Sequence, residues 1–208
     1  MYPMVSKQEL KPYRMFCSDF LTDLCRSLHK KYGITATFLA VGSGMWNMVS
    51  RDSSGGFDLD YNLILHRIPE PYASGDLLTL KNQIRSLADG ILHRKPGLSF
   101  SYGKDSTSSL TYYLRNPKDG PFHIDLGILW ERGGKYYRLI HDKRLSRAIW
   151  NEAPDLSQTK ARVQAINRRG LSDKLREEFL SQKAREAGTD KLSYVIFTEA
   201  VNRVYQKI

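Results

Sequence analysis

The segment Phe57-Asp58-Leu59-Asp60-Tyr61 opens an apolar run, and the two acids inside it are the first indication of the fold. The run predicts a β-strand over residues 57–66. Successive side chains of a strand point to opposite faces, so Asp58 and Asp60 share one face while their apolar neighbours share the other. Two adjacent carboxylates repel each other unless a cation lies between them, and hard oxygen ligands suit Mg²⁺ or Mn²⁺.

A third acid interrupts another apolar run, Phe122-His123-Ile124-Asp125-Leu126-Gly127-Ile128-Leu129. The run predicts a central strand, in which an unpaired carboxylate would be costly. If this strand lies beside residues 57–66, then Asp58, Asp60 and Asp125 converge. Three such donors can hold two divalent ions about 3.5–4 Å apart, which aligns the attacking and leaving oxygens of nucleotidyl transfer. The alternative interpretation of Asp125 is a strand-end residue or the buried partner of an arginine.

Glycines mark the end of an earlier β-branched and aromatic segment, residues 34–41, which predicts another strand. Gly42-Ser43-Gly44 follows this strand and precedes a short helix predicted over residues 45–49. The glycines would let a phosphate approach the backbone, and Ser43 would add a hydroxyl donor. The same three residues also describe a plain turn, so the motif gains meaning only from the order strand, glycine turn, helix and acid-bearing strand.

Two helices with repeating apolar faces are predicted in the first half of the sequence. Ser6-Lys7-Gln8-Glu9 has the form of a capping box for the first helix, which ends near Gly33. A start with Pro12 in the first turn is the alternative. The second helix follows the apolar spacing of residues 77–91 and closes at Pro96-Gly97. Helices of this kind cover a sheet with their apolar faces.

Further strands are predicted as two hairpins, 98–102 with 110–114 and 122–130 with 136–140. Beyond residue 153 the periodicity is helical, with Gly188 ending one helix and Thr189 capping the next. The predicted fold class is therefore α+β, a mixed β-sheet backed by helices with a small C-terminal helical part. We predict a core domain of residues 1–150 and a helical extension of residues 151–208.

The composition of the 208 residues is that of a globular protein, with 41% hydrophobic and 26% charged residues. It excludes extended disorder, and the lack of a long apolar run predicts a soluble, cytoplasmic protein without a membrane partner. The net charge of +10 favours polyanionic partners. Cys17 and Cys25 lie too far apart along a predicted helix to pair, so both are predicted to be reduced thiols.

The order of these motifs resembles the DNA polymerase β-like nucleotidyltransferase superfamily. The signature of that superfamily appears here as Val41-Gly42-Ser43, Phe57-Asp58-Leu59-Asp60-Tyr61 and Ile124-Asp125-Leu126. The long gap at residues 44–57, which ends in Phe57 just before the first acid, is also similar to the branch that includes cyclic GMP-AMP synthase and Mab21-like proteins. The chain is much shorter than those enzymes, so the resemblance does not extend to a cyclic dinucleotide product.

The resemblance implies a nucleotidyltransferase fold and a metal-dependent transfer of a nucleoside monophosphate from a nucleoside triphosphate to a hydroxyl. Asp58 and Asp60 would bind both metal ions, and Asp125 would complete one metal site and help to activate the attacking hydroxyl. Gly42 and Ser43 would hold the triphosphate. The positive charge favours RNA, such as a tRNA end, as the acceptor, while a protein side chain, a small molecule or a second nucleotide stays open.

A protein that binds nucleotides or RNA on the same fold without catalysis is the alternative. Three converging negative charges argue against it, because they would weaken the binding of a polyanion. His123 shares a strand face with Asp125 and is a candidate substrate contact, although a plain strand residue is the simpler interpretation. Candidate phosphate or acceptor contacts, for each of which ordinary surface charge is the simpler explanation, are Lys104, Arg115, Lys118, Arg162, Arg168, Arg169 and Lys174.

Overall fold

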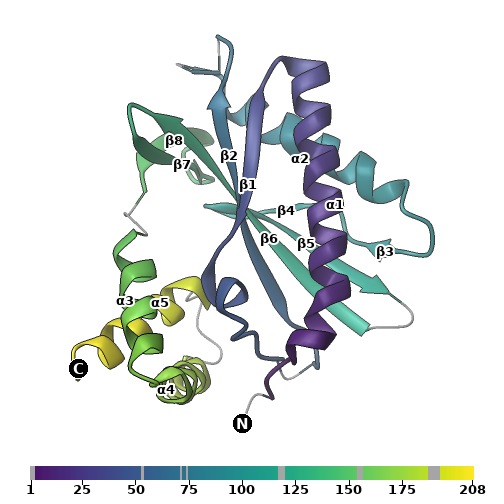
Figure 1. Ribbon diagram of the computed structural model, residues 1–208. Helices are drawn as coiled ribbons and strands as arrows, with labels where there is room; N and C mark the ends of the chain where they lie inside the picture. Colours follow the sequence, from purple (N-terminus) through teal and green to yellow (C-terminus); the bar gives the residue numbers. More distant parts are fainter. Residues whose placement is uncertain are drawn as a thin grey trace.

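Figure 1 shows the computed structural model, which describes residues 3–52, 54–70, 72–73, 75–116, 120–153, 157–186 and 193–208. The helices are α1 (Lys7–Tyr32), the 3-10 turn η1 (Gly42–Trp46), α2 (Leu77–His93), α3 (Ser157–Arg168), α4 (Ser172–Arg185) and α5 (Ser193–Tyr205). The strands are β1 (Thr35–Ala40), β2 (Asp58–Arg67), β3 (Ser99–Phe100), β4 (Lys104–Asp105), β5 (Ser109–Asn116), β6 (Gly120–Arg132), β7 (Lys135–Asp142) and β8 (Arg147–Glu152). The predicted α+β class is confirmed. Lys118, Gly188 and Thr189, for which the sequence makes predictions, lie outside the described residues.

The strands form one mixed sheet in which β2 and β6 run parallel and the other pairs run antiparallel. The order is β1-β2-β6-β5-β3, and β4 also pairs with β5. Strand β6 is long enough to pair with β5 along its first half and with β7 along its second half. The two acid-bearing strands are therefore neighbours at the centre of the sheet.

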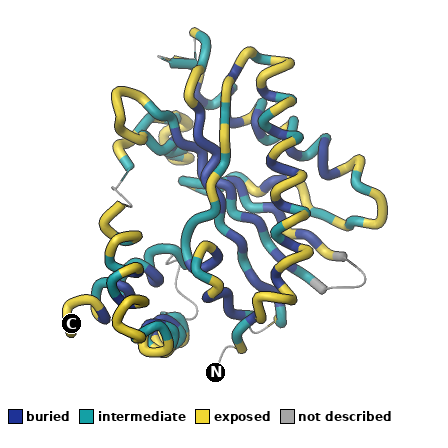
Figure 2. The backbone as a smooth tube through the Cα atoms, in the orientation of Figure 1, coloured by how far each residue is buried: buried dark blue, intermediate teal, exposed yellow. Residues whose placement is uncertain are grey.

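Helices α1 and α2 pack on one face of this sheet. Helix α1 begins at the predicted cap, where the Ser6 hydroxyl accepts a hydrogen bond of 3.1 Å from the backbone N–H of Glu9, and it ends at Gly33 with φ 66°. Its apolar side chains share one core with those of α2 and with Leu59 and Tyr61 of β2. Figure 2 marks the buried residues of the helices and strands in dark blue along the backbone. Because strand side chains alternate, burial of this face leaves the acids of β2 on the other.

The C-terminal helices α3, α4 and α5 gather at one end of the sheet, at the lower left of Figure 1. Their apolar side chains form a second buried cluster that includes Val163, Phe179 and Phe197. Met48, just after η1, belongs to the same cluster, so the helical part lies against the glycine turn. The division into residues 1–150 and 151–208 stays a prediction. Within the described ranges no helix combines the length and apolarity needed to cross a membrane.

Two features of the sheet differ from the sequence-based expectation. Strand β8 is absent from the sequence-based prediction. None of its residues is fully buried, and its sequence Arg-Ala-Ile-Trp-Asn-Glu therefore shows only a weak alternation of apolar and polar residues. The first predicted hairpin contains two short strands, β3 and β4, that both pair with β5. Gly103 separates them, and a Cβ there would lie 2.7 Å from the Tyr112 ring, so the chain can pass this ring only without a side chain.

The two cysteines are free thiols, as predicted, and both lie on α1. Cys17 is buried and Cys25 is partly buried. Burial raises the pKa of the Cys17 thiol to about 12 and that of Cys25 to about 11. Since the thiolate is the reactive form, neither residue is suited to nucleophilic chemistry at neutral pH.

Candidate active site

The three acids singled out in the sequence lie on one face of the parallel pair β2 and β6. Asp60 stands directly opposite Asp125 in the register, and Asp58 stands opposite His123. Neighbouring strands are about 4.8 Å apart, so residues that stand opposite each other are close neighbours. The intervening Leu59 is buried on the helix-covered face. The structure therefore brings Asp58, Asp60 and Asp125 together on the face that α1 and α2 leave open.

Burial and like charge raise the pKa of two of these carboxyl groups. Loss of surrounding water raises the pKa of Asp60 well above its ordinary value, and the charges of Asp125 and Asp58 raise it further. Burial also raises the pKa of Asp125, with a contribution from Asp58. The Thr111 hydroxyl on β5 donates a hydrogen bond of 2.5 Å to Asp125 Oδ1, which acts in the opposite direction. Burial and mutual repulsion thus make Asp60 and Asp125 harder to ionise than an ordinary aspartate.

His123 lies beside this cluster as the partner of Asp58. Its Nδ1 is 3.0 Å from Asp58 Oδ1, and its ring packs edge-on against Tyr113 with 4.3 Å between centroids. The hydrogen bond to Asp58 raises the pKa of His123 more than burial lowers it, and the charge of Asp125 raises it further. His123, a candidate substrate contact in the sequence analysis, is therefore a hydrogen-bonding neighbour of the acids.

The glycine turn closes the site on the side of β1. It forms the start of η1, which ends at Asn47 in the left-handed region, so the short helix predicted over residues 45–49 begins earlier and has 3-10 geometry. Gly42 has a φ of 64°, and a Cβ at this position would lie 2.7 Å from Asp60 Oδ2. Gly42 therefore serves two needs, the left-handed backbone and the close approach of the Asp60 carboxylate.

Helix α1 holds the remainder of the turn in place. The Arg14 guanidinium donates hydrogen bonds to the backbone carbonyl of Gly44 and, at 2.7 Å, to Asn47 Oδ1. Ser43 is buried, and its carbonyl accepts a 3.0 Å hydrogen bond from the N–H of Met48. The position of the turn relative to β2 is thus set by contacts from a separate element.

Arg138 on β7 belongs to the site but was missed in the sequence. Its guanidinium donates to Asn62 Oδ1 at 3.3 Å and lies 5.8 Å from the centroid of the Tyr194 ring on α5. Gly127 makes room for it, since a Cβ there would collide with the guanidinium. Burial lowers the pKa of Arg138, while Tyr194 and Asp60 raise it. Two residues in the sequence could have pointed to a polar partner on this face. They are Asn62, two residues after Asp60, and Gly127, two residues after Asp125.

Lys183 on α4 is the second basic residue that acts on the acids. Its positive charge lowers the pKa of Asp60. Two other basic candidates have structural partners instead. Arg162 donates to Asn202 Oδ1 at 2.5 Å, and Arg169 donates to the backbone carbonyl of Ile208. Lys104 stands opposite Thr111 in the register and so shares the face of the acids.

The donor set has the chemistry that Mg²⁺ or Mn²⁺ requires. All three groups are hard carboxylate oxygens, and the raised pKa values of Asp60 and Asp125 indicate that a cation would stabilise their ionised forms. Among the residues that the structure describes, no three His, Cys, Asp or Glu side chains are already arranged around one ion position.

No protein-family model and no curated protein matches the sequence. Solved structures of DncV from Vibrio cholerae do match, over 99% of this chain and 69% of theirs. The TM-score is 0.60 at 13% identity for DncV described as a cyclic AMP-GMP synthase and prokaryotic cGAS homolog. It is 0.60 for the complex with the linear intermediate 5′ pppA(3′,5′)pG and 0.62 for the complex with nonhydrolyzable GTP, both at 11% identity. At such identities the matches show the fold alone: this chain has an α+β fold like that of the DncV structures.

Proposed function

We propose that this chain transfers a nucleoside monophosphate from a nucleoside triphosphate to a hydroxyl group, with Mg²⁺ or Mn²⁺ held by Asp58, Asp60 and Asp125. One observation carries the proposal: Asp60 faces Asp125 across parallel strands, and Asp58 is close enough to raise the pKa of both. A site for binding polyanions alone would be weakened by these charges. Divalent cations bound by these carboxylates would neutralise them and would in turn bind the phosphates of a nucleotide.

The metal ions, when bound, would supply charge neutralisation and alignment of the attacking and leaving oxygens. The residues of the chain would do the rest. Gly42-Ser43-Gly44 would hold the triphosphate beside Asp60, because Gly42 brings backbone and carboxylate close together. Arg138 and Lys183 would balance the negative charge of the phosphates, since both already act electrostatically on Asp60.

The acceptor is proposed to be the hydroxyl of a second nucleotide. The support is the fold match to a DncV structure that contains a linear dinucleotide intermediate. RNA, which the net charge of +10 favours, is the alternative acceptor. A protein side chain or a small molecule as acceptor would give yet other products. An assay with labelled nucleoside triphosphate can distinguish all of these acceptors by the product that carries the label.

Replacement of Asp58 by asparagine is expected to abolish transfer while the fold survives, because the change is nearly isosteric and removes a metal ligand. The assay incubates the protein with each α-labelled nucleoside triphosphate and Mg²⁺ or Mn²⁺, with and without total RNA, and sizes the products on a gel. Asp19→Asn is the matched control, since Asp19 is an exposed residue of α1.

Label in a small product would identify a nucleotide acceptor, and label in RNA or in the protein would identify those acceptors instead. The proposal requires that label vanish in Asp58→Asn and persist in Asp19→Asn. Equal labelling by the wild type and Asp58→Asn would contradict it. Absence of transfer together with metal-independent nucleotide binding would favour a binding protein.

Replacement of Arg138 by methionine is expected to weaken binding of a nonhydrolysable nucleoside triphosphate by about 10- to 100-fold, the value of one hydrogen bond to a charged group. The guanidinium has five donors, and Asn62 is its one hydrogen-bond acceptor among the described residues, so donors remain for phosphate. Calorimetry in the presence of Mg²⁺ measures the affinity. Arg132→Met, which removes an arginine stacked on Trp130, is the control and should bind like the wild type. Equal affinity of Arg138→Met and the control would exclude Arg138 from the nucleotide site.

A further inference from the structure

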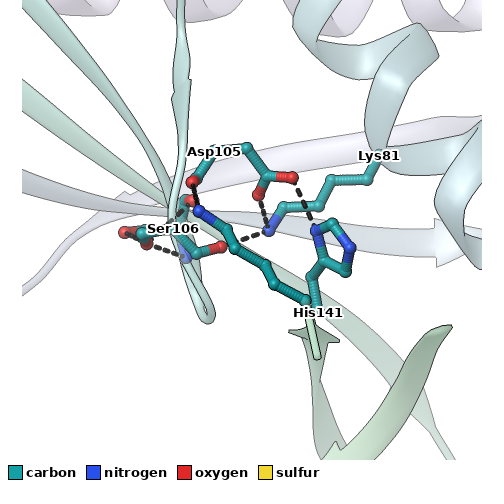
Figure 3. Close-up of polar contacts among 6 residues, drawn as sticks. Lys81, Asp105, Ser106 and His141 are labelled. Atoms are coloured by element: carbon teal, nitrogen blue, oxygen red, sulfur yellow. Dashed lines mark hydrogen bonds and ion pairs between the residues drawn. The ribbon is translucent and has the colours of Figure 1, made fainter. Parts of the chain in front are cut away.

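A network of charged groups lies on the helix-covered face, behind the candidate site, and Figure 3 shows it in close-up. Asp105 on β4 is its centre, with Oδ1 2.5 Å from Lys81 Nζ and Oδ2 2.6 Å from His141 Nδ1. Lys81 also donates to the Ser106 carbonyl at 2.7 Å, and Lys143 donates to the Asp105 carbonyl at 2.5 Å. This set, called the Asp105 network below, joins α2, β4 and β7.

The Asp105 network holds β4 in place, beside hydrogen bonds that hold the turn after it. Strand β4 contains two residues, too few for its ladder to fix its position. The turn that follows is closed by a 3.0 Å hydrogen bond from the N–H of Ser106 to the Ser109 carbonyl. It is tied to β7 by a 2.7 Å hydrogen bond from the N–H of His141 to the Thr107 carbonyl. The network and these backbone hydrogen bonds together anchor β4 and the turn that leads into β5.

This anchored segment is continuous with the candidate site. Asp105 stands opposite Leu110 on the helix-covered face, so the preceding Lys104 points to the other face, opposite Thr111. Thr111 in turn stands opposite Asp125 and donates to its Oδ1 at 2.5 Å. One row of residues thus crosses the open face from β4 through β5 to Asp125.

The charges of the Asp105 network are not explained by overall stability. Lys81 is 2% exposed, and burial lowers its pKa in spite of its carboxylate partner. Apolar residues of similar size are often as stabilising as a buried ion pair. A carboxylate bound by a lysine on one side and a histidine on the other adds something different, because the directions of these bonds fix the position of the strand that carries it.

We propose that Asp105 is a positioning residue of the nucleotidyl transfer site: held by Lys81 and His141, it fixes β4 and the start of β5 so that Thr111 orients Asp125. The inference rests on the proposed function. Asp105 touches neither substrate nor metal in this scheme and acts through Thr111. Loss of Asp105 should therefore affect the start of β5 and the carboxylate cluster before it affects the rest of the sheet.

Two measurements on the complete chain test this proposal: hydrogen exchange of backbone amides and calorimetric Mn²⁺ affinity. In Asp105→Asn, exchange over residues 109–116 should be faster by about tenfold or more, while β2 keeps its protection, because a buried ion pair has lost one partner. Mn²⁺ affinity should fall by about tenfold, as is typical when a group that orients a ligand is lost. The control Asp23→Asn, far from β4 in the sequence, removes partly exposed ion pairs with Arg26 and Lys95 and should change neither quantity.

A double-mutant cycle separates positioning from a general loss of stability. Thr111→Val removes the hydroxyl that binds Asp125 and should by itself lower Mn²⁺ affinity by about tenfold. In the Thr111→Val background, Asp105→Asn should cause no further loss, because Thr111 is the link between the two sites. Independent, additive losses would overturn the proposal. Unchanged exchange over residues 109–116 in Asp105→Asn would overturn it as well, whether or not the chain binds Mn²⁺.

If Asp105→Asn does not fold, the same measurements apply to Lys81→Met/Asp105→Leu, which removes both charges and leaves neither unpaired. This variant should fold and still show faster exchange over residues 109–116, and wild-type exchange there would overturn the proposal. If the proposed function itself is wrong, the measurements give a different result. Wild type and Asp60→Asn would then bind Mn²⁺ equally weakly, while the exchange measurement would still report on Asp105.

Discussion

Asp60→Asn is expected to abolish nucleotidyl transfer and, at the same time, to raise the melting temperature of the metal-free protein. Loss of a group that only orients a metal ligand costs about 10- to 100-fold, so loss of a ligand should lower the transfer rate by more than about 100-fold. The stability gain follows from the raised pKa of Asp60, because asparagine keeps the shape and removes a charge that is buried and also repelled by Asp125 and Asp58. A rise of about 2–4 °C would correspond to about 1 kcal/mol in a chain of this size.

The sign of this effect depends on pH. The pKa of Asp60 is higher in the folded protein than in the unfolded chain, so the folded state binds the proton more tightly. The stability contributed by protonation is complete below about pH 4 and is lost as the pH rises through the folded pKa. Thermal unfolding without divalent ions should therefore show the gain of Asp60→Asn at pH 7.5 and a much smaller gain near pH 4.

Addition of Mn²⁺ provides the internal check on this interpretation. The cation should raise the melting temperature of the wild type and leave Asp60→Asn nearly unchanged, because a ligand that binds only the folded state stabilises it. Asp19→Asn should behave like the wild type. A lower melting temperature for Asp60→Asn would show that Arg138 and Lys183 already stabilise the Asp60 carboxylate, and retained transfer would remove Asp60 from the mechanism.

The acids of the site could be located from sequence because they depend on a local rule. Alternation along a strand places Asp58 and Asp60 on one face, and an acid within an apolar run marks Asp125. The likeness of motif order then implied that their strands are neighbours. The parallel register that sets Asp60 opposite Asp125 involves segments far apart in the chain, and no local pattern contains that information.

Arg138 and the Asp105 network show what local rules leave out. Arg138 comes from β7, reaches across Gly127 on β6 and binds Asn62 on β2, so its role depends on the lateral order of three strands. Lys81 left one trace in the sequence, since it falls within the apolar spacing of α2 and is buried there. Its partner Asp105 lies in a polar segment that predicts only a loop, so the pair emerges from the packing of α2 against β4.

Gly42→Ala should reduce transfer by about tenfold or more, the loss expected when a group that positions a metal ligand is removed. At a φ of 64°, any residue with a Cβ is strained by about 1–2 kcal/mol. The new Cβ would also lie 2.7 Å from Asp60 Oδ2, closer than van der Waals contact, so the carboxylate would have to turn away from the glycine turn. Transfer rate and melting temperature are to be measured together.

Gly97→Ala separates the two effects of this change, because Gly97 has a φ of 72° and no atom within 4 Å of an added Cβ. Both variants should lower the melting temperature through the same backbone strain, whereas only Gly42→Ala should lower the transfer rate and the Mn²⁺ affinity. The difference between them then measures how far function depends on the position of Asp60 against the turn. If both variants were equally active, Asp60 would not need that position, and Gly42 would be required only for the path of the backbone between β1 and η1.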